Sequence, residues 1–374
     1  MNFDLSDEQQ MLVDNARRFV REHCGIEARL AAIASEAGFS RERWAELGRL
    51  GWLALPLSEE AGGLGGGDVD IALLAEELGR GLVPEPFIDT AVLCATLLEQ
   101  APPSQIRDSL LARAANGEII LALAHMEPGD RSEFETAPTT RAQPNADGWR
   151  LHGSKHFVVH GGTADYWLVS ANIENQQGFA LFLLSRDQAS TAEIYEYTLI
   201  DGSRAVDIHL HDVGLSTSAL LLEPGVAAQA LEKALNRAMI ASTASAIGSM
   251  EAVMEATAVH LKTREQYGKP LAQFQALQHR MAEMLVETDK ARSGLFNALA
   301  SLKTEDPRAR RRAISGAKSL ASRAALFVTA QGIQLHGAIG VTEEFSVGHH
   351  YKSALIYDKR FGDAEFHLAR WAGG

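Results

Sequence analysis

One stretch of the sequence restricts the fold of the last third of the chain. Between Gly225 and Gly268 there is no proline and only one glycine, Gly248. Because proline and glycine are the residues that interrupt helices, one long helix is expected to span much of this stretch. A second helix is predicted around residues 271–302, and Pro307 marks the turn into a third over residues 308–335. Long antiparallel helices of this kind form a bundle.

The first part of the chain is also predicted to be helical. Ser6 and Gln9 have the spacing of a capping box at a helix start, and apolar residues follow at helical intervals. The glycine-rich run at residues 61–67 interrupts this pattern. A further helix over residues 68–82 is expected to end before Pro84.

The middle of the chain has the pattern of strands. Val206, Ile208 and Leu210 alternate with polar residues, which is typical of a half-buried strand. Similar short apolar runs occupy residues 155–159, 166–170 and 179–184. The sequence therefore predicts an α+β fold in three domains: N-terminal helices (1–117), an antiparallel β barrel or sandwich (118–224) and a C-terminal helical bundle (225–374).

Composition excludes several classes of partner and site. The formal net charge of −13 argues against nucleic acid or anionic lipid as the main partner. Only two cysteines are present, Cys24 and Cys94, so neither a disulfide scaffold nor a cysteine zinc cluster is expected. The first residues lack the pattern of an export signal, and no apolar run approaches the ~20 residues of a membrane span. We expect a cytoplasmic protein.

Generic catalytic motifs do not identify the reaction. The chain has no phosphate-binding loop of the G-x-x-x-x-G-K-[ST] type, no H-E-x-x-H and no G-x-S-x-G. His209 and His211 share a strand face without a third ligand nearby, so a solvated face is favoured over a metal site. These residue patterns indicate a three-part soluble protein that binds a ligand at a domain junction.

Three separated segments carry a family pattern. They are residues 126–132 leading into 151–159 (MEPGDRS and LHGSKHFVV), residues 263–271 leading into 274–284 (TREQYGKPL and FQALQHRMAEM), and residues 334–340 (QLHGAIG) followed by Glu344 and Phe345. Their order and spacing resemble the acyl-CoA dehydrogenase family of flavoenzymes along essentially the whole chain. The ending at residues 361–364 is similar to the subgroup that contains the small subunit of pimeloyl-CoA dehydrogenase, which some steroid side-chain dehydrogenases resemble too.

The resemblance implies both the chemistry and the assembly. Such enzymes bind FAD between the β domain and the C-terminal bundle, with the adenine half against a neighbouring subunit. They desaturate an acyl-CoA thioester between its α and β carbons, and an electron-transfer flavoprotein accepts the electrons. The expected assembly is a homo- or hetero-tetramer with another acyl-CoA dehydrogenase subunit. The resemblance implies no nucleic acid partner and no membrane span.

The resemblance also implies which residues contact FAD. On the flavin-ring side they are Met126, Ser132, Phe157 and Val159. On the adenine side, Arg264 would pair with the pyrophosphate of the adjacent subunit's cofactor, as a guanidinium does well. Tyr267 would pack at the same place, Gln275 and Gln334 would form hydrogen bonds to the adenosine half, and Ala338 stands where the family has the second glycine of a pair.

The catalytic base is where this sequence departs most from the family. The usual glutamate position before a Gly-Thr pair is Phe361, and the alternative position, ten residues before Gly248, is Ala238. The flavin-side threonines are also replaced, by Met126 and Val159. Neither Phe361 nor Ala238 can accept a proton.

Two explanations of the missing base follow. In the first, Asp363, on the same terminal segment, serves as the base. In the second, which we favour, a partner subunit supplies it. At the level of function the alternatives are an acyl-CoA dehydrogenase subunit with a non-standard base, a catalytically silent structural subunit, and a related flavin oxidase or monooxygenase. The acyl chain and the electron acceptor are not determined by the sequence.

Overall fold

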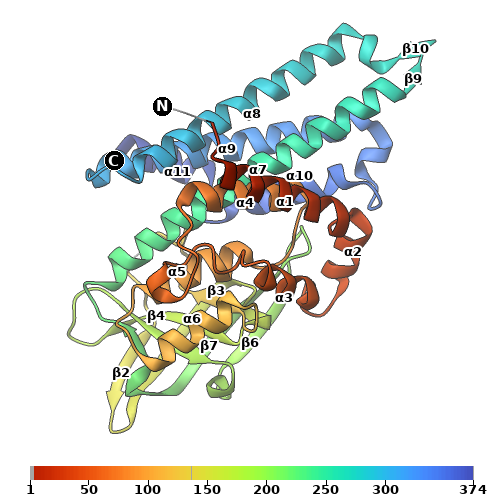
Figure 1. The fold of residues 1–374 in the computed structure, drawn as a ribbon. Helices are drawn as coiled ribbons and strands as arrows, with labels where there is room; N and C mark the ends of the chain where they lie inside the picture. The colour runs from red at the N-terminus through yellow and green to blue at the C-terminus, as the bar shows by residue number, and fades with distance from the viewer. Residues whose placement is uncertain (1–3, 136, 374) are drawn as a thin grey trace. The chain divides into compact units, whose positions relative to one another are not determined.

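The structure is a computed structural model that describes residues 4–135 and 137–373. The chain forms two compact units (Figure 1). The helical unit comprises Met1–Ala31, Asp68–Val83 and Met239–Gly374, and the sheet unit comprises Ala32–Gly67 and Pro84–Ala238. Each unit thus combines segments that are far apart in the sequence.

The predicted order of helices, strands and helices is confirmed. The N-terminal helices are α1 (Asp7–His23), α2 (Ile26–Ala34), α3 (Arg41–Arg49), α4 (Asp68–Arg80), the π-helix η2 (Phe87–Cys94), α5 (Ala95–Glu99) and α6 (Gln105–Ala115). The C-terminal helices are α7 (Ala227–Thr263), α8 (Gln275–Ser301), α9 (Pro307–His336), the short η7 (Gly337–Val341), α10 (Ser346–Lys359) and α11 (Ala364–Gly373). The long helix expected after Gly225 is α7, which has 37 residues.

The start of α1 is the predicted capping box. The Ser6 hydroxyl accepts a hydrogen bond from the backbone N–H of Gln9, and the Gln9 side chain accepts one from the backbone N–H of Ser6. Two of the backbone donors that a helix start leaves without partners are thereby satisfied.

The middle of the chain forms the predicted strands. They are β1 (Leu121–Ala124), β2 (Arg141–Asn145), β3 (Gly148–Val159), β4 (Tyr166–Ile173), β5 (Ala180–Ser185), β6 (Glu193–Thr198), β7 (Arg204–Ser216) and β8 (Leu220–Leu222). Along β7 the side chains of Val206, Ile208 and Leu210 are buried and those between them are partly exposed, as the alternation predicted. The strand order is β6-β7-β3-β2-β4-β5-β8, with β1 beside β4.

The expectation of a purely antiparallel β domain needs one correction. Strand β4 pairs in parallel with both β1 and β2, so the sheet is mixed. Parallel pairing requires a long connection between the strands, and the chain between β1 and β4 supplies it. The π-helix η2 is fastened to β1, because the Thr90 hydroxyl donates to the carbonyl of Leu121 at 2.9 Å and accepts from its N–H at 3.2 Å.

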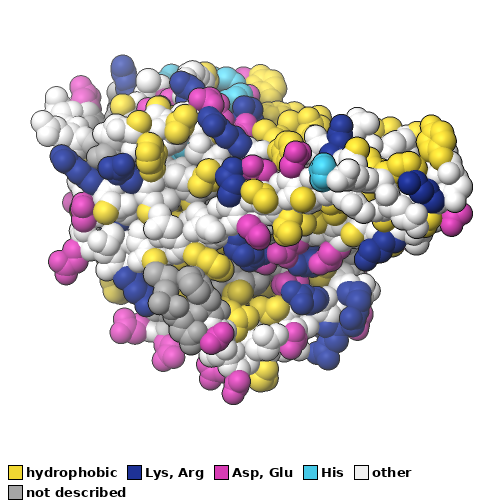
Figure 2. All heavy atoms as spheres, turned by 90° about the horizontal axis from the view of Figure 1, so that it is seen from above, with side chains coloured by type: hydrophobic (Ala, Val, Ile, Leu, Met, Phe, Trp, Pro, Cys, Tyr) yellow, Lys and Arg dark blue, Asp and Glu magenta, His cyan; other side chains and the backbone are white. Residues whose placement is uncertain are grey.

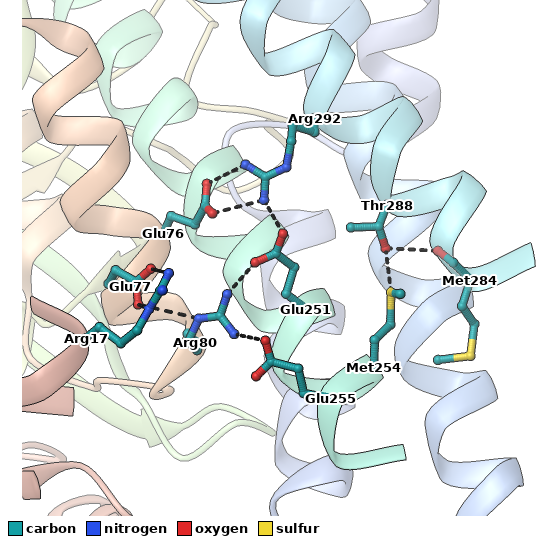
Figure 3. A network of polar contacts seen from close by, with 10 residues as sticks. All are labelled: Arg17, Glu76, Glu77, Arg80, Glu251, Met254, Glu255, Met284, Thr288 and Arg292. Carbon is teal, nitrogen blue, oxygen red and sulfur yellow. Dashed lines mark hydrogen bonds and ion pairs between the residues drawn. The ribbon is translucent and has the colours of Figure 1, made fainter. Parts of the chain in front are cut away.

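The helical unit contains a network of charged side chains from α1, α4, α7 and α8 (Figure 3). Arg292 on α8 donates two 3.0 Å hydrogen bonds to Glu76 on α4 and also contacts Glu251 on α7. Arg80 on α4 contacts Glu251 as well. Burial raises the pKa of Glu76, and the hydrogen bond and charge of Arg292 oppose this only in part.

Helix α9 and η7 together are long and apolar enough, by length and composition alone, to cross a membrane. Their most apolar window has a mean hydropathy of 1.3, and 44% of it is buried inside the protein. A core helix of a soluble protein passes the same test, so this property does not by itself indicate a membrane span.

Candidate cofactor and acyl-CoA site

The segment after α7, which carries one of the family motifs, forms a small exposed hairpin. Strand β9 (Glu265–Gln266) pairs with β10 (Lys269–Pro270), and Figure 1 shows this hairpin where α7 passes into α8. Tyr267 lies in the turn with a φ of 55° and is 93% exposed. Arg264 is exposed just before the hairpin. An exposed guanidinium and an exposed aromatic ring are available to a ligand or partner from outside this chain.

Two histidines join the end of α7 to the end of α9. The rings of His260 and His336 lie with centroids 4.6 Å apart. The backbone N–H of Arg264 donates to the carbonyl of His260 at 2.8 Å, so the backbone of Arg264 is fixed next to this histidine pair. Gln334 and Ala338, which flank His336 in sequence, are both exposed. The fold therefore places the backbone of Arg264 next to a histidine that contacts the segment carrying Gln334 and Ala338.

His336 has a buried nitrogen without a hydrogen-bond partner in the described part of the chain. Its Nδ1 lies 2.8 Å from the carbonyl of Gly332, which can only accept, so Nδ1 carries the proton. The buried Nε2 is then a hydrogen-bond acceptor that meets no donor. Burial, followed by the charges of His336 and Arg264, lowers the pKa of His260. The sequence patterns predicted no role for either histidine, although His336 lies inside the QLHGAIG segment.

The backbone beside His336 leaves room for a ligand. Gly337 has a φ of 65° and a ψ of −141°, and a Cβ built there would meet no atom within 4 Å. Such a backbone is accessible to glycine and is strained for other residues. A guanidinium, a carboxamide and an open glycine fit an anionic dinucleotide such as FAD. The residues present on this side thus fit the expected cofactor.

Gln275 begins α8, directly after the hairpin, and its side chain is exposed. The ammonium group of Lys269 lies over the ring of the neighbouring Phe274, 4.3 Å from the ring centroid. The ring centroids of Tyr267 and Phe274 are 6.3 Å apart. These contacts fix the geometry of the hairpin relative to α8.

The four residues expected on the flavin-ring side all belong to the sheet unit. Met126 is half-buried, and its carbonyl accepts from the N–H of His156 at 2.8 Å. Ser132 is fully buried, and its hydroxyl accepts from the N–H of Phe134 at 3.2 Å. Phe157 is half-buried with a φ of 54°, and Val159 is buried at the end of β3. The hydroxyl of Ser132 is therefore engaged within its own loop.

The usual position of the catalytic glutamate is occupied by a buried phenyl ring. Phe361 is 0% exposed and has a φ of 60°. Its carbonyl is 2.7 Å from Nε2 of the buried His367. The segment before it is held by Lys318, whose ammonium donates to the carbonyl of Tyr357 at 2.7 Å. Phe361 supplies apolar packing at this position and no proton acceptor.

Asp363 lies at the start of α11. Its Oδ1 accepts from the backbone N–H of Phe366 at 2.8 Å, and its Oδ2 is 3.7 Å from the ammonium of Lys359. This is the geometry of a helix N-cap with a neighbouring cation. Both oxygens of the carboxylate therefore have contacts within this segment.

The matches with known proteins follow the same three parts. Residues 6–118 match the family model described as the acyl-CoA dehydrogenase N-terminal domain, residues 122–213 the middle domain and residues 227–373 the C-terminal domain. This three-part succession of domains defines a class of flavoenzymes. The chain belongs to the acyl-CoA dehydrogenase family.

Individual relatives extend over nearly the whole chain. The "Probable acyl-CoA dehydrogenase YngJ" of Bacillus subtilis is 27% identical over 373 residues, which cover 98% of this chain and 97% of the relative. A solved structure of a variant of the "Tcur3481-Tcur3483 steroid ACAD" is 29% identical with a TM-score of 0.87 and covers 98% of this chain and 97% of its own. The "FAD complex of PigA" shares the fold, with a TM-score of 0.90 at 22% identity, and covers 100% of this chain and 98% of its own.

Membership of the family confirms the predicted enzyme class and cofactor at the level of the family. Its members are oxidoreductases that act on a CH–CH group, and FAD is their cofactor.

Proposed function

We propose that this chain is one subunit of an FAD-dependent acyl-CoA dehydrogenase that introduces an α,β double bond into an acyl-CoA thioester. The observation that carries the proposal is the adenine-side cluster: the ends of α7 and α9 meet at His260 and His336, beside Arg264 and the exposed Gln334. This cluster keeps Arg264, Gln275 and Gln334 and departs from the family pattern at Ala338, whereas both base positions are altered. We keep the domain limits 1–117, 118–224 and 225–374 and a cytoplasmic location as parts of the proposal.

In this proposal one set of residues binds the cofactor, and a separate carboxylate removes the proton. Arg264, Gln275 and Gln334, with Tyr267 and Ala338 beside them, bind the adenine half of a neighbouring subunit's cofactor. Met126, Ser132, Phe157 and Val159 shape the ring side. FAD, when bound, supplies the two-electron acceptor for the hydrogen leaving the β carbon. A carboxylate removes the α proton, and an electron-transfer flavoprotein accepts the electrons.

The assembly we propose is a tetramer, and we favour one with a second kind of subunit because Phe361 and Ala238 occupy the usual positions of the base. Large apolar side chains on α8 and α9 are exposed, namely Leu285, Val286, Phe296 and Leu320. Hydrophobic side chains are visible among charged ones on the face shown in Figure 2. The steroid dehydrogenase structure is described by two joined protein names, which is the kind of pairing proposed for this chain. A steroid or other bulky acyl chain is the substrate class that we infer from this likeness.

A second candidate, a catalytically silent subunit whose partner supplies the base, is favoured by the contacts of Asp363. The carboxylate of Asp363 caps α11 and faces Lys359, so both of its oxygens already have structural contacts. The third alternative, an oxidase or monooxygenase, is distinguished by rapid reoxidation of the reduced flavin in air.

Replacing Asp363 with asparagine separates the two candidates. Asparagine caps a helix as well as aspartate does, so stability is expected to be unchanged. If Asp363 is the base, anaerobic flavin reduction by acyl-CoA should slow by about 10²–10⁴-fold. Stopped-flow absorbance measures this rate, and an unchanged rate would assign the base to the partner.

The proposal as a whole is tested by expressing the chain alone and recording its visible absorption and native mass. A yellow tetramer with about one FAD per chain is expected of a complete site. A colourless or dimeric product that becomes yellow on co-expression with a second subunit supports the hetero-oligomer. Absence of flavin in both preparations would overturn the proposed function.

A further inference from the structure

A buried ion pair lies beneath the loop that carries Met126 and Ser132. We call residues 125–140 the flavin-edge loop; residue 136 lies outside the described part of it. Lys155 on β3 is 0% exposed at its side chain, and its ammonium lies 2.8 Å from Oε1 of Glu127, which is 5% exposed. The ammonium also donates to the carbonyl of His125 at 3.2 Å and to the hydroxyl of Ser170 at 2.9 Å. Its three hydrogens therefore all have acceptors.

Glu127 joins the beginning of this loop to its end. Its Oε2 accepts from the N–H of Thr139 at 2.6 Å and from the Thr139 hydroxyl at 2.5 Å. Its Oε1 accepts from the N–H of Thr140 at 2.9 Å. One carboxylate thus connects the two ends of the flavin-edge loop, and its ion pair with Lys155 connects the loop to strand β3.

His125 extends the same network to the middle of the loop. Its Nε2 lies 2.6 Å from the carbonyl of Glu135, so this nitrogen carries the proton. Its Nδ1 then accepts from the hydroxyl of Ser170 at 2.8 Å, while the oxygen of Ser170 accepts from Lys155. Burial lowers the pKa of His125 to about 4, so the imidazole is neutral at pH 7.

Met126 is held between two anchored neighbours, His125 and Glu127. Its own carbonyl is bonded to the N–H of His156, which is the residue next to both Lys155 and Phe157. The position where the family usually has a threonine side chain is therefore fixed through its backbone and not through its side chain. The loop conformation depends on the buried charges beneath it.

We propose that Glu127 and Lys155 are positioning residues for the flavin ring, because their ion pair sets the shape that the flavin-edge loop presents to it. The inference rests on the proposed function, since it requires the loop to contact flavin. It adds a role for two residues that lie behind the predicted contacts. A buried ion pair is weak evidence of net stabilisation, because apolar replacements of both partners are often equally stable, so positioning is the better account of its presence.

The ion pair exists only in a limited range of pH, because each partner must carry its charge. Burial alone would raise the pKa of Glu127, but the charge and hydrogen bond of Lys155, with Thr139 and Thr140, hold it at about 2. Burial lowers the pKa of Lys155 to about 8, against the opposing charges of Glu127 and Asp130. The other groups facing the ammonium are His125 and the neutral Ser170. The ion pair is therefore expected to be lost from the folded protein as the pH rises above about 8.

The test compares variants of two buried ion pairs in the same unit. Glu127→Gln and Lys155→Met each remove one charge beneath the loop. The control is Glu85→Gln, which breaks a second buried pair, between Arg43 and Glu85 at 2.7 Å. Each full-length protein, with its partner subunit if flavin binding needs one, is stripped of flavin and titrated with FAD. Circular dichroism checks the fold.

The loop variants are expected to bind FAD about tenfold more weakly, because a loop that holds its binding shape in only about a tenth of the molecules lowers the apparent affinity by that factor. They should also shift the flavin absorption band. Glu85→Gln should lower the unfolding midpoint and leave FAD affinity unchanged. Equal FAD affinity in the loop variants and the wild type, or an equal loss in the control, would overturn the inference.

Wild-type protein provides a measurement that does not depend on the variants folding. Its FAD affinity is expected to fall as the pH rises above about 8, because the protonated fraction of Lys155 then decreases about tenfold per pH unit. The near-UV spectrum should stay unchanged over the same range. A flat profile contradicts the inference, while a wild-type protein that never binds FAD contradicts the proposed function instead.

Discussion

Replacing Gly248 with alanine is expected to destabilise the helical unit by about 3 kcal/mol or more, the upper range for overpacking a close contact. A Cβ at Gly248 on α7 would lie 1.9 Å from the backbone carbonyl of Glu76 on α4. The obstacle is backbone and not a flexible side chain, so one helix must move to admit a methyl group. Gly79 meets α7 in the same way, with its Cβ position 2.1 Å from the carbonyl of Ser245.

The displaced helices also carry the charged network of Figure 3. Glu76, Arg80 and Glu251 lie on the two helices that would separate, so the same substitution is expected to lengthen ion pairs that are partly buried. The unfolding midpoint in urea, followed by circular dichroism, measures the effect.

The matched control is Gly294→Ala on α8. There the Cβ would meet the Cα of Ala317 at 3.2 Å, a contact that a shift of a few tenths of an ångström relieves. Alanine also gains about 1 kcal/mol of helix propensity over glycine. This variant should remain within about 1 kcal/mol of the wild type. Equal midpoints for the two variants would show that α4 and α7 do not meet as described.

Replacing Arg264 with alanine is expected to weaken FAD retention by about 10- to 150-fold, since a charge-assisted phosphate contact is worth about 1.5–3 kcal/mol. The guanidinium is exposed, and its backbone is held by His260 and Leu271 through hydrogen bonds of 2.8 and 2.9 Å. The loss should therefore be one of ligand binding and not of folding. Flavin content after dialysis and the dissociation constant for added FAD measure it.

Two further variants define the origin of the effect. Lys262→Ala removes an exposed positive charge two residues away and should leave FAD binding nearly unchanged. Arg264→Lys keeps the charge without the planar fork that contacts two phosphate oxygens, so partial loss is expected. If Arg264→Ala retains FAD as the wild type does, the adenine-side assignment is wrong.

The pH dependence of the free energy of unfolding in acid should measure the contribution of the Glu127 carboxylate without any flavin being bound. The pKa of its carboxyl, at about 2, lies below the ordinary value of 4.5. A lowered carboxyl pKa stabilises the folded protein above the unfolded value, and this contribution is lost as the pH falls from about 4.5 toward 2. Glu127→Gln should therefore show a shallower decrease of the unfolding midpoint across this range than the wild type shows.

Much of the fold was predictable from the sequence, because the patterns that encode it are local. The capping box at Ser6, the uninterrupted stretch that becomes α7 and the alternation along β7 each act within a few residues of one another. The family motifs singled out Arg264 and Gln334 for cofactor binding, and both side chains are exposed in the structure. The same motifs showed that Phe361 and Ala238 leave the chain without the usual base.

Tertiary structure alone decided which distant residues meet. Three contacts join segments whose local sequence patterns do not predict that they meet. They are the parallel pairing of β4 with β1 and β2, the ring contact of His260 with His336, and the ion pair of Glu127 with Lys155. The contact of Asp363 with the N–H of Phe366 likewise shows that this carboxylate caps a helix, one of the two roles that the sequence left open for it. Local patterns encode the faces that each element buries, whereas these contacts are set by the packing of whole elements against one another.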